Sequence, residues 1–234
     1  MSRVDRTPAL TTTSFAILGL LAIRPWTTYE LAVQMERTLN RVWPRARSRL
    51  YEEPKKLVAH GLAEAARETV GRRPRTVYTI TEEGRRALAE WLRTPGAGPS
   101  LEFEQNLKLF FADFGTRDDA LAQLEAAREW ATAQLEVFVT AARDYVEDRG
   151  PFPQRLAVTS PGARFLVDFY DLVDRWAAWA STIVQGWPED PSQAEPTLEV
   201  DQYILRLAEE RARRPGGDAA VPAPDLAPHQ VSGP

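Results

Sequence analysis

The chain has 234 residues, of which 44% are hydrophobic, no cysteine, and a formal net charge of −4 at neutral pH. Its length suits one or two domains with buried cores, and the lack of cysteine excludes disulfides and thiolate metal sites. No apolar run approaches the roughly 20 residues of a membrane-spanning helix, and the first residues have no signal-peptide layout. We therefore expect a cytoplasmic protein without a membrane partner.

Charge is distributed unevenly along the chain. Residues 1–93 contain 17 Lys/Arg against 10 Asp/Glu, whereas residues 94–234 contain 12 against 23. Opposite signs in the two halves indicate a basic binding domain joined to an acidic body. The basic residues are densest between Arg37 and Arg75, and charge of this kind gives affinity for phosphates without distinguishing one base from another.

Two helices are predicted before residue 43. The first follows the hydroxyl residues 12–14, which can cap its free N–H groups, and it ends before Pro25. The second begins where Thr27 and Glu30 have the spacing of a capping box. Four apolar residues are expected on its inward face: Leu31, Met35, Leu39 and Val42.

A third helix is predicted from about Ala46 to His60, and Gly61 is its expected C-terminal cap. Pro54 lies inside this helix, where it lacks the N–H of a regular helical hydrogen bond and crowds the preceding turn. The proline therefore predicts either a kinked helix or a helix that begins later.

Two strands are predicted next, over residues 62–68 and 76–80, and the residues between them combine turn chemistry with arginines. Thr81 is then expected to cap a fourth helix that runs through Leu92. Three helices, two strands around a basic turn and another helix are the element order of a winged helix-turn-helix domain. The Pro/Gly-rich residues 94–100 predict a linker, so the DNA-binding domain is expected to span residues 1–93.

Amphipathic helices are predicted in the rest of the chain. An aromatic segment, residues 101–114, precedes a long helix from about Arg117 to Asp148, and Ser160-Pro161 is expected to begin the next helix. Apolar residues then recur at steps of four and three, which is typical of a coiled coil and predicts a dimer interface. These residues are Phe165, Phe169, Leu172, Trp176, Trp179 and Ile183.

A last helix is predicted from about Leu198 to Arg213, and residues 214–234 are rich in Pro, Gly and Ala and are expected to be disordered. The predicted fold class is mostly α. An N-terminal winged helix-turn-helix of three to four helices and a two-stranded wing precedes a C-terminal helical dimerisation domain, residues 101–213, which is also the place for an effector.

The chain resembles the PadR family of bacterial regulators through a set of short motifs spread over some eighty positions. The matching residues are Ile17-Leu18-Gly19-Leu20-Leu21, Tyr29-Glu30-Leu31, Trp43, Leu50-Tyr51, Gly61-Leu62, Arg73-Pro74-Arg75, Val77-Tyr78, Ile80-Thr81, Gly84 and Trp91-Leu92. The chain departs from the family at two positions. It has Thr28 where the family commonly has Gly, and it has Glu52 where the family commonly has Pro, its own proline being Pro54. The resemblance implies DNA binding by the winged helix and dimerisation by the C-terminal helices.

The candidate DNA-binding residues lie at the second helix, the third helix and the wing. They are Thr28, Tyr29, Arg45, Arg47, Ser48, Arg49, Tyr51, Lys55, Lys56, Arg72, Arg73 and Arg75. Arginine suits a phosphate or a narrow minor groove, which favours contact with double-stranded DNA. The alternative is that these residues form a solvated charged face, or that the domain is a protein-interaction module that binds an acidic partner.

Aromatic residues of the C-terminal half are candidates for the binding of a small aromatic effector, because apolar sites are built from such side chains. They are Phe110, Phe114, Phe138, Phe169, Trp176 and Trp179. The alternative interpretation, that they form core and dimer interface, is the usual one for an aromatic stripe at helical spacing.

Motifs for catalysis are missing from the sequence. It contains no Gly-rich phosphate loop, no G-x-S-x-G elbow and no H-E-x-x-H zinc motif, and its only histidines are His60 and His229. We therefore expect no enzymatic activity, no cofactor and no metal site. The sequence predicts a dimeric, nucleoid-associated transcriptional regulator that reads a pseudo-palindromic operator, more as a repressor than as an activator.

Overall fold

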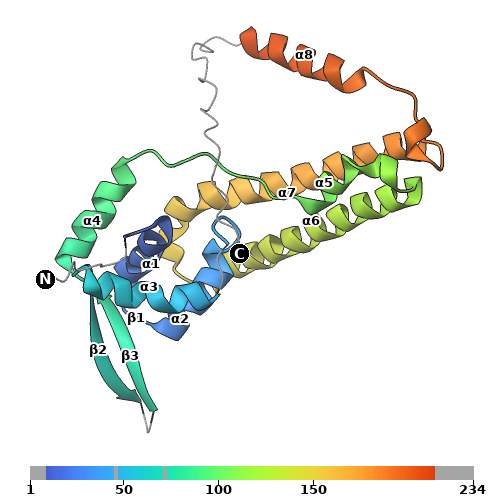
Figure 1. Cartoon of the computed structure of the whole chain (residues 1–234). Coiled ribbons are helices and arrows are strands. Elements are labelled where there is room, and N and C mark those ends of the chain that lie inside the picture. Colours follow the sequence, from blue (N-terminus) through green and yellow to red (C-terminus); the bar gives the residue numbers. More distant parts are fainter. Residues whose placement is uncertain (1–8, 45–46, 71–72, 214–234) are drawn as a thin grey trace, which may run out of the picture. The chain divides into compact units, whose positions relative to one another are not determined.

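The computed structural model describes residues 9–44, 47–70 and 73–213, apart from the side chains of residues 47–49, 70 and 73. The chain forms two units, residues 1–102 and residues 103–234 (Figure 1). The predicted fold class is confirmed, since the structure is mostly helical and its N-terminal unit carries a small antiparallel sheet. Within the described ranges no helix is long and apolar enough to cross a membrane. The predicted tail, residues 214–234, lies outside the described residues.

Helix α1 (Thr12–Ile23) is the central helix of the N-terminal unit. Its cap is Thr11, whose hydroxyl accepts a hydrogen bond from the Ser14 N–H, while the Ser14 hydroxyl accepts one from the Thr11 N–H at 2.9 Å. The helix is covered by α3, by α4 (Glu82–Arg93) and by strand β3 (Arg73–Ile80). Its buried residues therefore lie on several sides: Thr13, Ser14, Ile17, Leu18, Leu20 and Leu21.

Helix α2 (Thr28–Gln34) begins at the predicted capping box and continues into a π-helical turn, Met35–Leu39. The Asn40 N–H donates to the Met35 carbonyl at 2.9 Å, a bond that spans five residues. Such a turn inserts one residue into the helical period, so the residues after it are displaced from the expected face. The prediction that Val42 lies inward is therefore wrong, and its side chain is exposed.

Helix α3 (Arg47–Ala59) runs through Pro54, so the alternative of a later helix start is wrong. Pro54 and Leu57 are fully buried, and Leu50 on the same helix is buried as well. The chain leaves the helix through a turn that contains Gly61, whose φ of +71° is readily adopted only by glycine. Pro54 therefore belongs to the face of α3 that packs into the domain.

The sheet has the strand order β1-β3-β2, with β1 at Trp26–Thr27 and β2 at Ala63–Val70. Strands β2 and β3 are longer than predicted, because the residues from Arg73 to Arg75 belong to β3 and only residues 71 and 72 connect the strands. Strand β1 was not predicted, since two residues are too short for a periodic signal. Thr81 caps α4 as expected, by accepting the Gly84 N–H at 3.0 Å.

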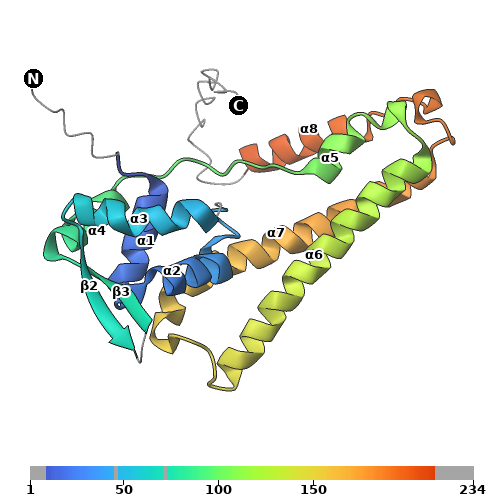
Figure 2. The same cartoon turned by 60° about the horizontal axis from the view of Figure 1, so that its bottom comes forward.

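The C-terminal unit is a helical hairpin with short helices at its ends. Helices α6 and α7 pack along each other (Figure 2). The helices of this unit are α5 (Glu104–Leu109), α6 (Arg117–Val146), α7 (Leu156–Gln185) and α8 (Glu199–Ala212), with 3-10 turns at Ala112–Phe114, Pro153–Arg155 and Pro191–Gln193. Helix α7 begins before the predicted cap, so Pro161 lies inside it and the Ser160 hydroxyl donates to the Leu156 carbonyl at 2.5 Å.

The contact between α6 and α7 uses a stripe of α7 that lies one residue beyond the predicted coiled-coil stripe. Its buried residues on α7 are Leu166, Tyr170, Val173, Ala177, Ala180 and Val184. The last four form one core cluster with Ala120, Leu124, Ala127 and Ala131 of α6. In the predicted stripe, Phe165, Leu172 and Trp179 remain 59%, 54% and 44% exposed, whereas Phe169 and Trp176 are partly buried against the core. The predicted stripe therefore flanks the core of the hairpin, and its three exposed residues leave an apolar face on the outside of α7.

Candidate nucleic-acid interface

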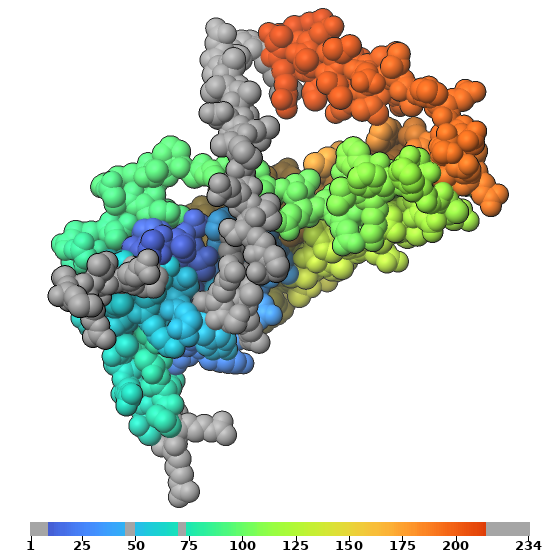
Figure 3. Space-filling view, in the orientation of Figure 1, coloured from blue at the N-terminus to red at the C-terminus, as the bar shows by residue number. Residues whose placement is uncertain are grey.

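Helix α3 and the wing, strands β2 and β3, present the basic residues of the N-terminal unit. In Figure 3 the wing projects from the rest of this unit as a narrow arm. Residues 47–49 form the first turn of α3, and Arg73 begins β3, although the side chains of these four residues are not described. Arg45 and Arg72 lie outside the described residues. The candidate side chains that the structure describes are Thr28, Tyr29, Tyr51, Lys55, Lys56 and Arg75.

The two lysines of α3 lie in different surroundings. The Lys55 side chain is 63% exposed and its ammonium group lies 2.9 Å from the Glu52 carboxylate, a hydrogen bond that raises the pKa of Lys55. The Lys56 side chain is only 12% exposed and its ammonium group lies 3.6 Å from the Glu53 carboxylate. Lys55 is thus available to a ligand on the surface of α3, whereas Lys56 is turned toward the inside of the domain.

Glu53 links α3 to α1 and was not recognised in the sequence. The fully buried Ser14 hydroxyl donates to a Glu53 carboxylate oxygen at 2.6 Å, across 39 residues of chain. A hydrogen bond to a carboxylate in a nearly buried place is strong and directional, so it fixes the position of α3 on α1. A glutamate beside a lysine in a helix is usually a surface residue, and no sequence signal marked this one.

A shallow hollow at the start of α2 brings four of the candidate residues together. Thr28 and Tyr29 come from α2, Tyr51 from α3 and Arg75 from β3. The remaining residues that line the hollow are Thr27, Glu30 and Thr76. Side chains from the second helix, the third helix and the wing therefore converge on one surface, with three hydroxyl groups and a guanidinium among the candidates.

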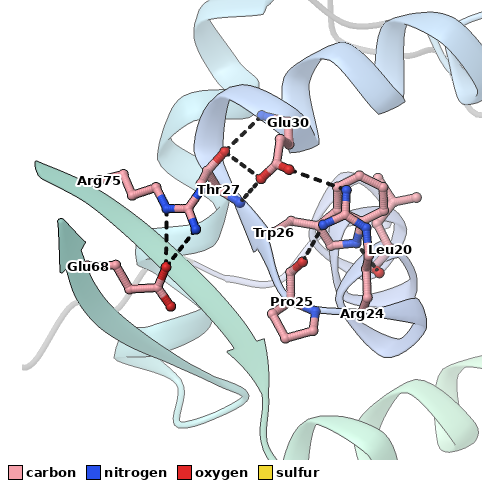
Figure 4. A network of polar contacts seen from close by, with 8 residues as sticks. All are labelled: Leu20, Arg24, Pro25, Trp26, Thr27, Glu30, Glu68 and Arg75. Carbon is pink, nitrogen blue, oxygen red and sulfur yellow. Dashed lines mark hydrogen bonds and ion pairs between the residues drawn. The ribbon is translucent and has the colours of Figure 1, made fainter. Parts of the chain in front are cut away.

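Polar contacts hold the start of α2 in place behind this hollow (Figure 4). A Glu30 carboxylate oxygen accepts the Thr27 N–H and the Thr27 hydroxyl, both at 2.8 Å, and the other oxygen pairs with Arg24 at 3.3 Å. Partial burial favours a higher pKa for Glu30, but the hydrogen bonds from Thr27 and the pairing with Arg24 outweigh it, and the pKa lies below its ordinary value. Arg24 also stacks over the Trp26 ring, 3.4 Å from its centroid.

On the wing, Arg75 and Glu68 form an ion pair between the two strands (Figure 4). The two residues are directly opposite each other in the strand register. The Arg75 Nε and Nη2 atoms both donate to Glu68 Oε2, at 3.1 Å and 2.8 Å. Both side chains are about half exposed, so Arg75 is held in a defined position while it remains accessible to a ligand.

The six candidate effector residues of the C-terminal unit lie in separate surroundings. Phe138 and Phe169 both pack against Tyr170, and Trp176 packs edge-on against Phe103 at 5.4 Å. The other three side chains, those of Phe110, Phe114 and Trp179, are exposed. In the described part of the chain no cluster of His, Cys, Asp and Glu suits a metal ion.

Comparison with known proteins agrees with the geometry of the N-terminal unit. Residues 17–90 match the family described as the transcriptional regulator PadR-like family. The negative transcriptional regulator PadR of Bacillus subtilis (strain 168) is 29% identical over 108 residues, which cover 45% of this chain and 59% of that relative's length.

Two solved structures of Bacillus subtilis PadR share the fold. PadR in complex with operator DNA superposes with a TM-score of 0.66 at 20% sequence identity, over 74% of this chain and 99% of that chain. PadR in complex with p-coumaric acid superposes with a TM-score of 0.60 at 19% identity, over 75% of this chain and 99% of that chain.

Proposed function

We propose that this chain binds double-stranded DNA and regulates transcription. Its residues 17–90 match the transcriptional regulator PadR-like family. The observation that carries this proposal is the convergence of Thr28, Tyr29, Tyr51 and Arg75 on one surface beside α3. In this arrangement α3 enters the major groove, and the wing contacts the backbone or the minor groove. The proposed activity of this surface is the binding of DNA, which requires no catalytic centre.

We also propose that the chain forms a dimer and that the C-terminal unit provides the interface. The outer stripe of α7, with Phe165, Leu172 and Trp179, exposes large apolar side chains along one helix face, which an identical stripe of a second copy can cover around a twofold axis. Two heads related by this axis would read two half-sites of a pseudo-palindromic operator. Sedimentation of the intact chain at micromolar concentration tests this step, and a monomer that binds its operator at full strength would contradict it.

The sign and the control of regulation follow the relatives. The curated relative is named a negative regulator, and its structure has been solved with p-coumaric acid. We propose that this chain is a repressor and that a small aromatic effector binds among the aromatic residues of its C-terminal unit. Such an effector releases DNA if it binds better to a state in which the two heads are spaced differently.

Selection of bound sequences from a random pool of duplexes is the decisive experiment. We expect the recovered duplexes to share a palindromic motif and to bind with a steep salt dependence, because Lys and Arg release counterions from phosphates. If the protein binds selected and scrambled duplexes equally weakly but binds an acidic protein surface well, the domain is a protein-interaction module.

Single substitutions on α3 locate the recognition surface. Arg47→Ala, Arg49→Ala and Lys55→Ala are each expected to weaken binding of the selected duplex, by about 1–3 kcal/mol where the side chain contacts a base. Replacing a phosphate contact instead weakens binding to all sequences and flattens the salt dependence. Arg86→Ala is the matched control, because Arg86 is an exposed arginine of α4 that is paired with Glu83.

A further inference from the structure

We infer that Glu68 is a positioning residue for DNA binding: it holds the Arg75 guanidinium at the edge of the hollow, in the orientation that receives a backbone phosphate. The inference rests on the proposed function and adds to it a residue of the same charge as the ligand. Its starting point is that Arg75 is the basic side chain of the hollow and forms an ion pair with a carboxylate of the neighbouring strand.

The strand pairing fixes both ends of this contact. Glu68 on β2 and Arg75 on β3 are opposite each other in an antiparallel ladder, so their side chains leave the sheet on the same face. Strand β3 is also paired with β1, where Thr27 lies opposite Val77. The base of the Arg75 side chain therefore sits on a strand that is tied directly to the start of α2, where the other residues of the hollow lie.

The geometry of the pair leaves part of the guanidinium open. Glu68 Oε2 accepts bonds from Nε and Nη2 of Arg75. A guanidinium has five N–H donors in one plane, so the donors of Nη1 and the second donor of Nη2 point away from this carboxylate oxygen. These donors form an edge that matches two oxygens of a phosphate.

The charges at the hollow are paired, and what favours an anion there is the set of open hydrogen-bond donors. Glu30 also lines the hollow, but its oxygens are occupied by Thr27 and Arg24. The hydroxyl residues Thr28, Tyr29 and Tyr51 line the same hollow. A phosphate of the DNA backbone that enters there meets one oriented guanidinium and hydroxyl donors.

Orientation and charge make opposite predictions for Glu68. If Glu68 acted only by its charge, its removal would strengthen DNA binding, because a carboxylate repels phosphates. If Glu68 orients Arg75, truncation leaves a long side chain free to rotate, and ordering it again on DNA costs conformational entropy. A side chain that keeps the acceptor oxygen but not the charge separates the two effects.

The test compares Glu68→Gln and Glu68→Ala in the full-length protein, with a selected duplex and a scrambled duplex at several salt concentrations. We expect Glu68→Gln to bind both duplexes at least as tightly as the parent. We expect Glu68→Ala to bind about two- to fivefold more weakly than Glu68→Gln for each head, which is the range of an exposed ion pair. The difference should vanish in the Arg75→Ala background, since no guanidinium is left to orient.

Glu64→Ala is the matched control, because Glu64 is an exposed residue of the same strand and the same face, opposite Thr79. It loses the same charge, and we expect unchanged or slightly tighter binding. If Glu68→Ala binds as tightly as Glu68→Gln, the positioning role is wrong while the proposed function stands. If the parent itself binds no duplex, the proposed function fails, and the role of Glu68 fails with it.

Discussion

The two units of this chain are held together by different kinds of contact. In the N-terminal unit, side-chain hydrogen bonds bridge distant segments: the Trp43 indole donates to the Thr13 hydroxyl at 3.0 Å, and the Ser14 hydroxyl donates to the Glu53 carboxylate at 2.6 Å. In the C-terminal unit, α6 and α7 meet along a repeated stripe that is rich in alanine. Individual hydrogen bonds fix the helices of the first unit, whereas many small apolar contacts fix those of the second.

The strongest way to test this contrast is to remove a central side chain of the helical hairpin. Leu124 is completely buried between α6 and α7, so we expect Leu124→Ala to lower the free energy of unfolding of the C-terminal unit by about 2–5 kcal/mol. Calorimetry of the intact chain should show the shift in one transition and leave that of the N-terminal unit in place. Val137→Ala, on an exposed position of the same helix, should change stability by no more than about 0.5 kcal/mol.

In the N-terminal unit a single added methyl group should have a comparable effect. A Cβ atom at Gly84 would overlap with the Leu62 carbonyl and approach Ile80 Cγ1 to 2.8 Å. We therefore expect Gly84→Ala to destabilise this unit by about 1–3 kcal/mol, because α4 must move off the sheet. Gly19→Ala is the control: its Cβ would meet nothing within 4 Å, and inside α1 it should stabilise by about 0.5–1 kcal/mol. Chemical denaturation measures both, and equal effects would contradict this packing.

A smaller effect is expected on assembly from the outer stripe of α7. Trp179→Ala should weaken the proposed dimer by about 1–2 kcal/mol, because a tryptophan in an interface buries a large apolar area. The stability of the hairpin itself should change little, since Trp179 is 44% exposed there. Sedimentation at a series of concentrations measures the shift. A dimer as strong as that of the parent would place the interface elsewhere.

The smallest expected effect concerns acid. The lowered pKa of Glu30 means that its contact with Thr27 stabilises the folded state above the ordinary carboxyl pKa and that this contribution is lost as the pH falls through the lowered value. Thermal melting of Glu30→Gln should therefore depend less on pH in the acid range than melting of the parent. Thr27→Ala should cost about 0.5–2 kcal/mol at neutral pH as a lost cap. Parallel pH curves for parent and Glu30→Gln would rule out this linkage.

The sequence predicted the elements of the N-terminal unit well, because each has its own local signal. Capping residues at Thr27 and Thr81 and the glycine at Gly61 marked helix ends that the structure confirms. Strand β1 and the bond from Ser14 to Glu53 could not be predicted, since both depend on segments that are far apart in sequence. Of the candidate site, the sequence indicated residues at the hollow, but not Glu68, which resembles any surface glutamate.

In the C-terminal unit, periodicity predicted long helices but not which side of them is inside. Two apolar stripes of α7 are adjacent, and each residue of one follows a residue of the other, as Ala177 follows Trp176. The larger residues stood out in the sequence, but the small ones allow the helices to approach closely and form the seam. Similarly, Pro161 predicted a helix start, but α7 begins five residues earlier at Leu156, so Pro161 lies inside the helix and leaves one helical hydrogen bond unmade.

Strand β1 sets the order in which the N-terminal unit can fold. Trp26 and Thr27 pair with Tyr78 and Val77, about fifty residues further along the chain, whereas the hairpin of β2 and β3 closes over two residues. Contacts of such different sequence separation form at different rates, because closing a longer loop costs more entropy. During synthesis the wing hairpin must leave the ribosome before β1 finds its partner. The start of α2, and with it the surface proposed to meet DNA, is thus completed only after the wing has been synthesised.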